Sequence, residues 1–223
     1  MLAYILRRLF QSVLVLLVTG LVAFSLFRFV GDPIENMLGQ ERTQADVEEL
    51  RARLGLDQPF VVQYWRFLEG AVQGEFGVSY RQGRPVSDLL VERAPATLEL
   101  AAVSGLFALT LGVGLGIYTA IRRRGMLANA IMTTSLIGVS LPTFLIGILL
   151  IWVFSVELGW LPSFGRGDTV DVGWWRTGFL TESGLLALIL PSITLGLYQM
   201  TLIMRLVRSE MLEVLRADYV RFA

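Results

Sequence analysis

The sequence predicts an all-α membrane protein: a polytopic bundle of four transmembrane helices with a short helical segment outside the membrane. Of the 223 residues, 54% are apolar and only 17% are charged, whereas soluble domains carry roughly 25% charged residues. A second observation is that four stretches lack charged residues and reach the length of roughly 20 helical residues that a bilayer core requires. These stretches are 9–27, 100–121, 125–156 and 183–204.

Each stretch is predicted to be helical, because backbone polar groups find no water in lipid and must be paired within the segment. The predicted spans are 9–30, 97–121, 127–156 and 184–204. The first follows a basic start, as the core of a signal peptide does. Its apolar run is longer than the roughly 7–15 residues typical of a signal, and no A-x-A-like cleavage site follows it. We therefore interpret it as a retained span.

Arginines near the span ends predict the orientation. Arg122–Arg124 form a tight turn between the second and third spans, and the segments 1–8 and 205–223 lie on the same side. That side has more Arg than acidic residues, whereas the opposite side has more acids than Arg. Because Arg and Lys are enriched in cytoplasmic loops, we predict that both termini are cytoplasmic. The predicted order is a cytoplasmic N-terminus, a first span, an external segment, three further spans and a cytoplasmic helix, at residues 1–8, 9–30, 31–95, 97–204 and 205–223.

The external segment 31–95 contains three patterns that predict short helices. They are "TQADVEELRARLG", "QPFVVQYWRFLEGAVQG" and the amphipathic piece "RPVSDLLVERAPATLEL", which is expected to end at Pro95, where the second span begins. These helices are expected to cap the external mouth of the bundle. A separate catalytic domain is not expected in a segment of this size without His or Cys.

Four tryptophans surround the second external segment, which follows the third span. They are Trp152, Trp160, Trp174 and Trp175. Trp is enriched where a membrane meets water, so an interfacial belt is the favoured interpretation. A stacking site for a sugar or a peptide is the alternative.

The composition excludes much catalytic chemistry. All basic residues are Arg, and the sequence has no Lys, His or Cys. Disulfides, Cys or His metal sites and Ser-His-Asp triads are therefore excluded, as is the phosphate-binding loop with its Lys. We predict no catalytic, cofactor-binding or metal-binding residues, no cofactor and no enzyme activity. Because the net charge is zero, nucleic acid is not expected as a partner.

Two spans contain uncharged polar residues that could line a pathway. Pro142, in "GVSLPTFLIG", predicts a kink, which is either structural or part of a gate. The fourth span is rich in hydroxyl and amide groups, which suit a polar cavity or bonds between helices. The candidates are Ser140, Pro142, Thr143, Tyr198 and Gln199. Small residues in the second span indicate close helix packing.

The segment "MRLVRSEMLEVLRADYVRFA" after the fourth span is amphipathic. Apolar residues recur near helical spacing among alternating charges. Such a helix either lies on the lipid surface or docks into a groove on a cytoplasmic partner.

The stretch "LPSITLGLYQMTLIMRLVRSEMLEVLRADYVRFA" resembles inner-membrane permease subunits of binding-protein-dependent ABC importers, in the dipeptide/oligopeptide/nickel branch. "MLAYILRRLFQSVLVLL" and "SLPTFLIGILLIWVFSVELGWLPSFG" resemble the same branch. The resemblance implies import of peptides or related substrates across the bacterial inner membrane by alternating access. It also implies four kinds of partner: a second permease, cytoplasmic ATP-binding subunits that hydrolyse ATP, a periplasmic substrate-binding protein and membrane lipid.

In that family a cytoplasmic loop carries an E-A-A triplet that docks on the ATPase. The triplet aligns here with residues 221–223, where only Ala223 matches. The implied coupling residues are Met211, Leu215, Arg216, Asp218, Tyr219, Arg221, Phe222 and Ala223. Family members typically have six spans, so the four found here imply a chain that lacks its C-terminal part and has an incomplete coupling element.

Two other functions remain open. A secondary transporter would need an intramembrane charge or a broken-helix ion site, and none of the four uncharged runs holds a charge. A membrane scaffold protein would explain the external helices but not the polar fourth span. The residues do not distinguish dipeptides, oligopeptides, glutathione or nickel chelates as substrates.

Overall fold

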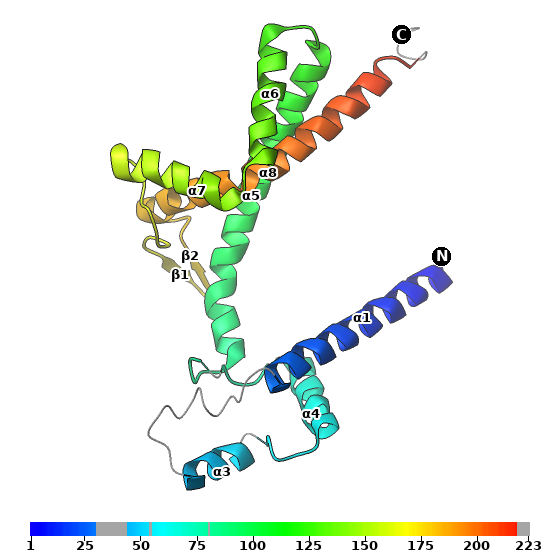
Figure 1. The fold of residues 1–223 in the computed structure, drawn as a ribbon, viewed down its shortest axis with the longest axis vertical. Helices are drawn as coiled ribbons and strands as arrows, with labels where there is room; N and C mark the ends of the chain where they lie inside the picture. Colours follow the sequence, from blue (N-terminus) through cyan, green and yellow to red (C-terminus); the bar gives the residue numbers. More distant parts are fainter. Residues whose placement is uncertain (30–43, 54, 80, 218–223) are drawn as a thin grey trace. The chain divides into compact units, whose positions relative to one another are not determined.

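The computed structural model describes residues 1–29, 44–53, 55–79 and 81–217 (Figure 1). The chain folds as two compact units, Met1–Val91 and Glu92–Ala223. The described residues are mostly helical, which confirms the predicted all-α fold class.

The described residues of the first unit form α1 (Leu2–Phe29), α3 (Gln44–Arg53), α4 (Phe60–Val72) and the start of a further helix. Aromatic rings join α1 to α4. The Phe24 ring centroid lies 5.5 Å from that of Phe60 and 5.7 Å from that of Tyr64, and the Tyr64 hydroxyl donates to the Leu17 carbonyl at 2.7 Å. Ring pairs at such separations contribute about 0.5–1.5 kcal/mol beyond burial. Helices α3 and α4 lie within the first two patterns that predict external helices.

The third predicted external helix does not end at Pro95. It continues into the second predicted span as one helix, α5 (Val86–Ile121). Proline has the φ of a helical residue, but inside a helix it removes one backbone hydrogen bond and its ring clashes with the preceding turn. Here Pro95 is buried, and the Thr97 hydroxyl donates to the Arg93 carbonyl at 3.4 Å. The helix thus continues through the proline, as membrane helices often do.

The second unit continues from α5 through a tight turn into five further elements and a final long helix. They are α6 (Met126–Ser140), α7 (Thr143–Ile151), the π-helix η1 (Trp152–Glu157), β1 (Val170–Val172), β2 (Trp175–Thr177) and α8 (Glu182–Val214). Figure 1 shows α6 lying beside the second half of α5 and α7 turning away from α6.

Two predicted boundaries differ from the observed ones. The third span, predicted at 127–156, is divided into α6, α7 and η1. The predicted coupling helix 205–223 is not separate from the fourth span, because α8 runs without interruption to Val214. The charged residues that follow 204 keep the helical period, and neither Gly nor Pro interrupts them.

Glycines form a close seam between α5 and α8. A Cβ atom added at Gly112 would lie 2.9 Å from Ile203 Cβ, and one at Gly116 would lie 2.8 Å from Val207 Cβ. By contrast, a Cβ at Gly114 would meet no described atom within 4 Å. The prediction that small residues of the second span serve helix packing is confirmed for Gly112 and Gly116.

A two-stranded hairpin, which the sequence analysis did not predict, precedes α8. Strands β1 and β2 pair antiparallel, with Val172 opposite Trp175. Gly173 begins the turn with a φ of +64°, a value that L side chains rarely adopt. The strands have three residues each, which is too short for an alternating pattern to show in the sequence.

Three of the described helices are long and apolar enough to cross a membrane, within Leu2–Leu26, Val86–Ile121 and Glu182–Val214. Two shorter apolar helices lie within Met126–Leu136 and Thr143–Glu157, in the predicted third span. The observed architecture therefore differs from four continuous spans in that the third span is broken between these two short helices.

Candidate functional site

The interruption between α6 and α7 is centred on Pro142. Helix α6 ends at Ser140, and Pro142 has φ −57° and ψ 137°, which is an extended conformation. Its carbonyl accepts the amides of Leu145 and Ile146 at 3.0 and 3.3 Å, and so begins α7. The kink predicted at this proline is thus a complete break with a new helix start.

Helix α8 packs on both sides of this break. Before it, the Thr201 hydroxyl donates to the Ser135 carbonyl at 3.3 Å, and Thr201 is fully buried. After it, a Cβ atom on Gly147 would lie 3.4 Å from the Thr194 methyl group. Because α8 holds α6 and α7 by separate contacts, a movement of α8 would act on both halves of the broken helix.

The predicted pathway residues flank this region. They are Ser140, Pro142, Thr143, Tyr198 and Gln199, and all of them are exposed. Tyr198 and Gln199 lie on α8 between the residues that contact α7 and α6. Within the described residues, no hydrogen bond joins any of the five to another. Their exposure leaves polar groups available to a ligand, and their role in transport stays a prediction.

The predicted coupling residues lie at the end of α8 and beyond it. Met211 is half-buried, whereas Leu215 and Arg216 are exposed. The remaining ones, Asp218, Tyr219, Arg221, Phe222 and Ala223, lie outside the described residues.

A buried acidic residue forms the centre of a polar site in the second unit. The Glu99 side chain, on α5, is 1% exposed. Arg166 Nη2 donates to its Oε2 at 3.2 Å, the Trp175 indole N–H donates to its Oε1 at 3.0 Å, and the Gly178 amide donates to Oε2 at 3.3 Å. A buried carboxylate is tolerated when it is paired and hydrogen-bonded, as Glu99 is.

Hydrogen bonds from the same loop also fix the start of α8. Thr181 is the N-cap, and its hydroxyl accepts the Gly184 amide at 3.1 Å while donating to the Asp168 carbonyl at 2.6 Å. The Ser183 hydroxyl donates to the Asp168 carboxylate at 2.8 Å. The loop between α7 and α8 is therefore bound both to α5 and to the first turn of α8.

Sequence reasoning missed this site. The pattern assigns no role to Glu99, and it places Trp175 in an interfacial belt. The available signal was a single acid at the entrance of a long apolar run, with an Arg and a Trp in the next external loop. Nothing in that pattern specifies which loop residues reach Glu99, because they are 67 to 79 residues away in sequence.

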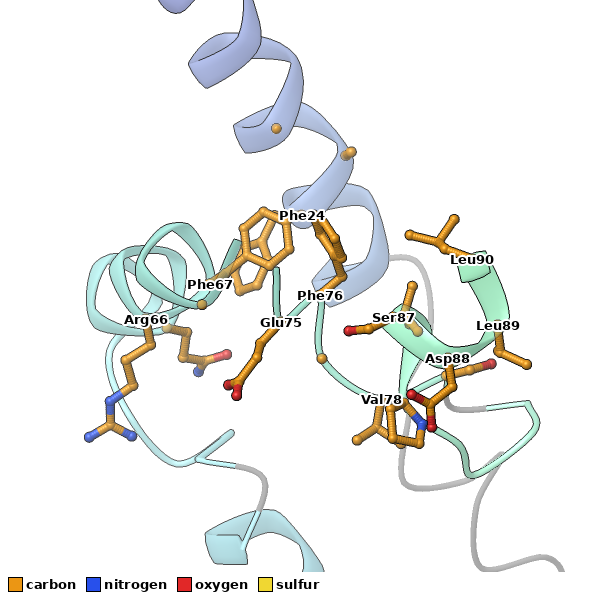
Figure 2. A pocket seen from close by; sticks show the side chains of 18 of the residues that line it. Phe24, Arg66, Phe67, Glu75, Phe76, Val78, Ser87, Asp88, Leu89 and Leu90 are labelled. Atoms are coloured by element: carbon orange, nitrogen blue, oxygen red, sulfur yellow. The ribbon is translucent and has the colours of Figure 1, made fainter. Parts of the chain in front are cut away.

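The first unit contains a cavity of about 1500 Å³ (Figure 2). It is bordered by the end of α1, by α4 and by the residues that lead into α5. Phe24, Phe67 and Phe76 provide an aromatic wall, and Glu75 and Asp88 provide charges around it. This mixed lining suits an amphipathic occupant. In the described part of the chain, no group of three acidic residues is placed to hold a metal ion.

Long apolar helices, a glycine seam and a proline-broken span define a polytopic helical membrane protein. Comparison with known families assigns it more closely. Residues 1–101 match the N-terminal region of the membrane component of binding-protein-dependent transport systems, and residues 112–223 match the inner membrane component of these systems. The chain belongs to this family of inner membrane components.

Three curated relatives match almost the whole chain. A dipeptide transport system permease of Alkalihalophilus pseudofirmus is 36% identical over 99% of this chain and 70% of its own length. A di/tripeptide permease of Pseudomonas aeruginosa is 39% identical over 100% and 70%, and an oligopeptide permease of Bacillus subtilis is 39% identical over 100% and 69%. The chain is therefore a permease component of an ABC importer, as its resemblance implied.

Proposed function

We propose that this permease carries peptides inward across the bacterial inner membrane. The supporting observation is that the three relatives, which match 99–100% of this chain, are named as permeases for dipeptides, di/tripeptides and oligopeptides. Because these names differ in the length of the peptide, the proposal assigns the chemical class of the cargo and not its length.

The exposed polar groups at the helix break would form part of the pathway. Ser140, Thr143, Tyr198 and Gln199 offer uncharged donors and acceptors, which match the amide groups of any peptide backbone without selecting its side chains. Pro142 would provide the joint at which α7 changes its direction relative to α6. Uncharged lining is also consistent with a transporter that takes its energy from ATP and not from protons.

Energy would come from other chains. The sequence has no Lys and therefore no phosphate-binding loop of the usual type. We assign ATP hydrolysis to cytoplasmic ATP-binding subunits, cargo delivery to a periplasmic substrate-binding protein, and the other half of the pathway to a second permease. The description of the family as binding-protein-dependent supports the second of these assignments.

The coupling to ATP would run through α8. This helix contacts α7 through Thr194 and α6 through Thr201 and then continues to Val214 without a break. Its end leads into the predicted coupling residues, so ATPase movements would reach the broken helix directly. The orientation that this requires places both termini in the cytoplasm, which the exposed Arg122–Arg124 turn supports.

Stimulated ATP hydrolysis by the complete importer in nanodiscs tests the proposal. The substrate-binding protein is added with a dipeptide, a tripeptide, a pentapeptide, a free amino acid or a nickel chelate. The proposal expects stimulation by at least one peptide and none by the amino acid. Stimulation by the nickel chelate alone would contradict it.

A further inference from the structure

Glu99 differs from the other described acidic residues of the second unit in being buried. The described others are exposed: Glu92, Glu157, Asp168, Asp171, Glu182, Glu210 and Glu213. Acidic residues within membrane helices are costly, and those that occur usually serve a function. The position of Glu99 near the predicted external end of a span therefore calls for an explanation beyond solubility.

Three of the donors to Glu99 come from successive parts of one loop. Arg166 precedes the β1–β2 hairpin, Trp175 lies in β2, and Gly178 follows it. One carboxylate thus fixes the entry, the middle and the exit of the hairpin on α5. Arg166 Nη2 also donates to the Arg176 carbonyl, so the guanidinium bridges α5 and the outer edge of β2.

The hairpin held in this way presents apolar side chains to its surroundings. Trp174 is 73% exposed although the adjacent Trp175 is anchored to Glu99, and the two rings meet edge to face at 5.4 Å. The contact with the anchored Trp175 ring orients the exposed Trp174 ring. The hairpin also carries Asp171, whose carboxylate pairs with Arg176 at 2.9 Å in an exposed position.

We propose that Glu99 is a positioning residue for transport. It holds the hairpin and the N-terminal end of α8 in a fixed arrangement on α5, and this arrangement sets how well the loaded substrate-binding protein engages the importer. The inference rests on the proposed function, because it requires the hairpin to be external and the importer to depend on a binding protein. Arg166 Nε is buried without a partner among the described residues.

Titration of the ATPase with the binding protein separates positioning from simple stabilisation. The complete importer in nanodiscs is assayed for peptide-stimulated ATP hydrolysis while the concentration of loaded binding protein is varied. Glu99→Gln keeps the size of the side chain but presents an N–H₂ group to donors. We expect its half-saturating concentration to rise about tenfold, with the maximal rate changed by less than about twofold.

Asp171→Ala is the matched control, because it removes an exposed ion pair from the same hairpin without touching Glu99. Its half-saturating concentration should stay within about twofold of wild type. An unchanged value for Glu99→Gln, or a fall in maximal rate alone, would overturn the proposal. A wild-type importer that the binding protein does not stimulate would instead refute the proposed function.

A second variant covers the case in which Glu99→Gln fails to assemble. Trp175→Phe retains an aromatic ring but removes the indole donor to Glu99, together with part of the ring that meets Trp174. It should raise the half-saturating concentration about threefold, less than Glu99→Gln does, because the carboxylate loses only one of its donors. No change in an assembled Trp175→Phe importer would overturn the proposal in the same way.

Discussion

The indole N–H of Trp175 lies 3.0 Å from the carboxylate of Glu99, although 76 residues separate the two in sequence. This bond connects a two-stranded hairpin outside the predicted spans to a helix that crosses the membrane. It attaches the loop before α8 to α5.

Disrupting this bond should destabilise the protein, and the loss should grow with the number of buried polar groups left without a partner. Trp175→Phe should lower the free energy of unfolding by about 1–3 kcal/mol, because a buried acceptor loses one donor. Glu99→Ala should cost about 3–5 kcal/mol, the usual loss when one partner of a buried pair is removed. Thermal unfolding of the purified protein in detergent measures both. Asp171→Ala, in an exposed pair, should cost less than about 1 kcal/mol, and equal losses for all three variants would contradict the assignment.

The seam between α5 and α8 predicts opposite effects for two glycines in one helix. Gly116→Ala should destabilise by about 1–3 kcal/mol, because the added Cβ would lie 2.8 Å from Val207 Cβ. Gly114→Ala meets no described atom within 4 Å and should be neutral or stabilise by up to about 1 kcal/mol through higher helix propensity. Unfolding midpoints in the same detergent compare them. A destabilising Gly114→Ala with a neutral Gly116→Ala would contradict the packing of α5 against α8 at Gly116.

Pro142 should matter for transport and not for insertion. Pro142→Ala restores a backbone donor and allows α6 and α7 to join, which removes the proposed joint. We expect the maximal rate of peptide uptake to fall roughly tenfold while membrane insertion is retained. Pro191→Ala is the control, because Pro191 lies within α8 without breaking it. If both variants transport like the wild type, the break is only structural.

The orientation predicts which cysteines an impermeant thiol reagent reaches. These 223 residues contain no Cys, so none of them competes with the introduced one. Gln82→Cys should react from the periplasm of intact cells, and Met126→Cys, next to the arginine turn, should react only after permeabilisation. Both positions are exposed in the structure, so access depends on the side of the membrane. The reverse labelling pattern would contradict the predicted orientation.

Physical reasoning from sequence reaches some of these features and not others. The long apolar helices and the discontinuity at Pro142 follow from local composition, because hydrophobic length and a missing amide act within one segment. A proline in an apolar pattern does not show whether the helix ends there or continues, and α5 continues through Pro95. The Glu99 site depends on which loop residues fold back onto α5, and a pattern of isolated Arg and Trp residues does not specify that contact.

Uptake of a labelled dipeptide or oligopeptide by proteoliposomes that contain the complete importer tests the central claim most directly. ATP is trapped in the lumen, and the loaded substrate-binding protein is added outside. We predict that the peptide accumulates only when both ATP and the binding protein are present, and that a non-hydrolysable nucleotide abolishes accumulation. Accumulation driven by a proton or sodium gradient without ATP would contradict the account.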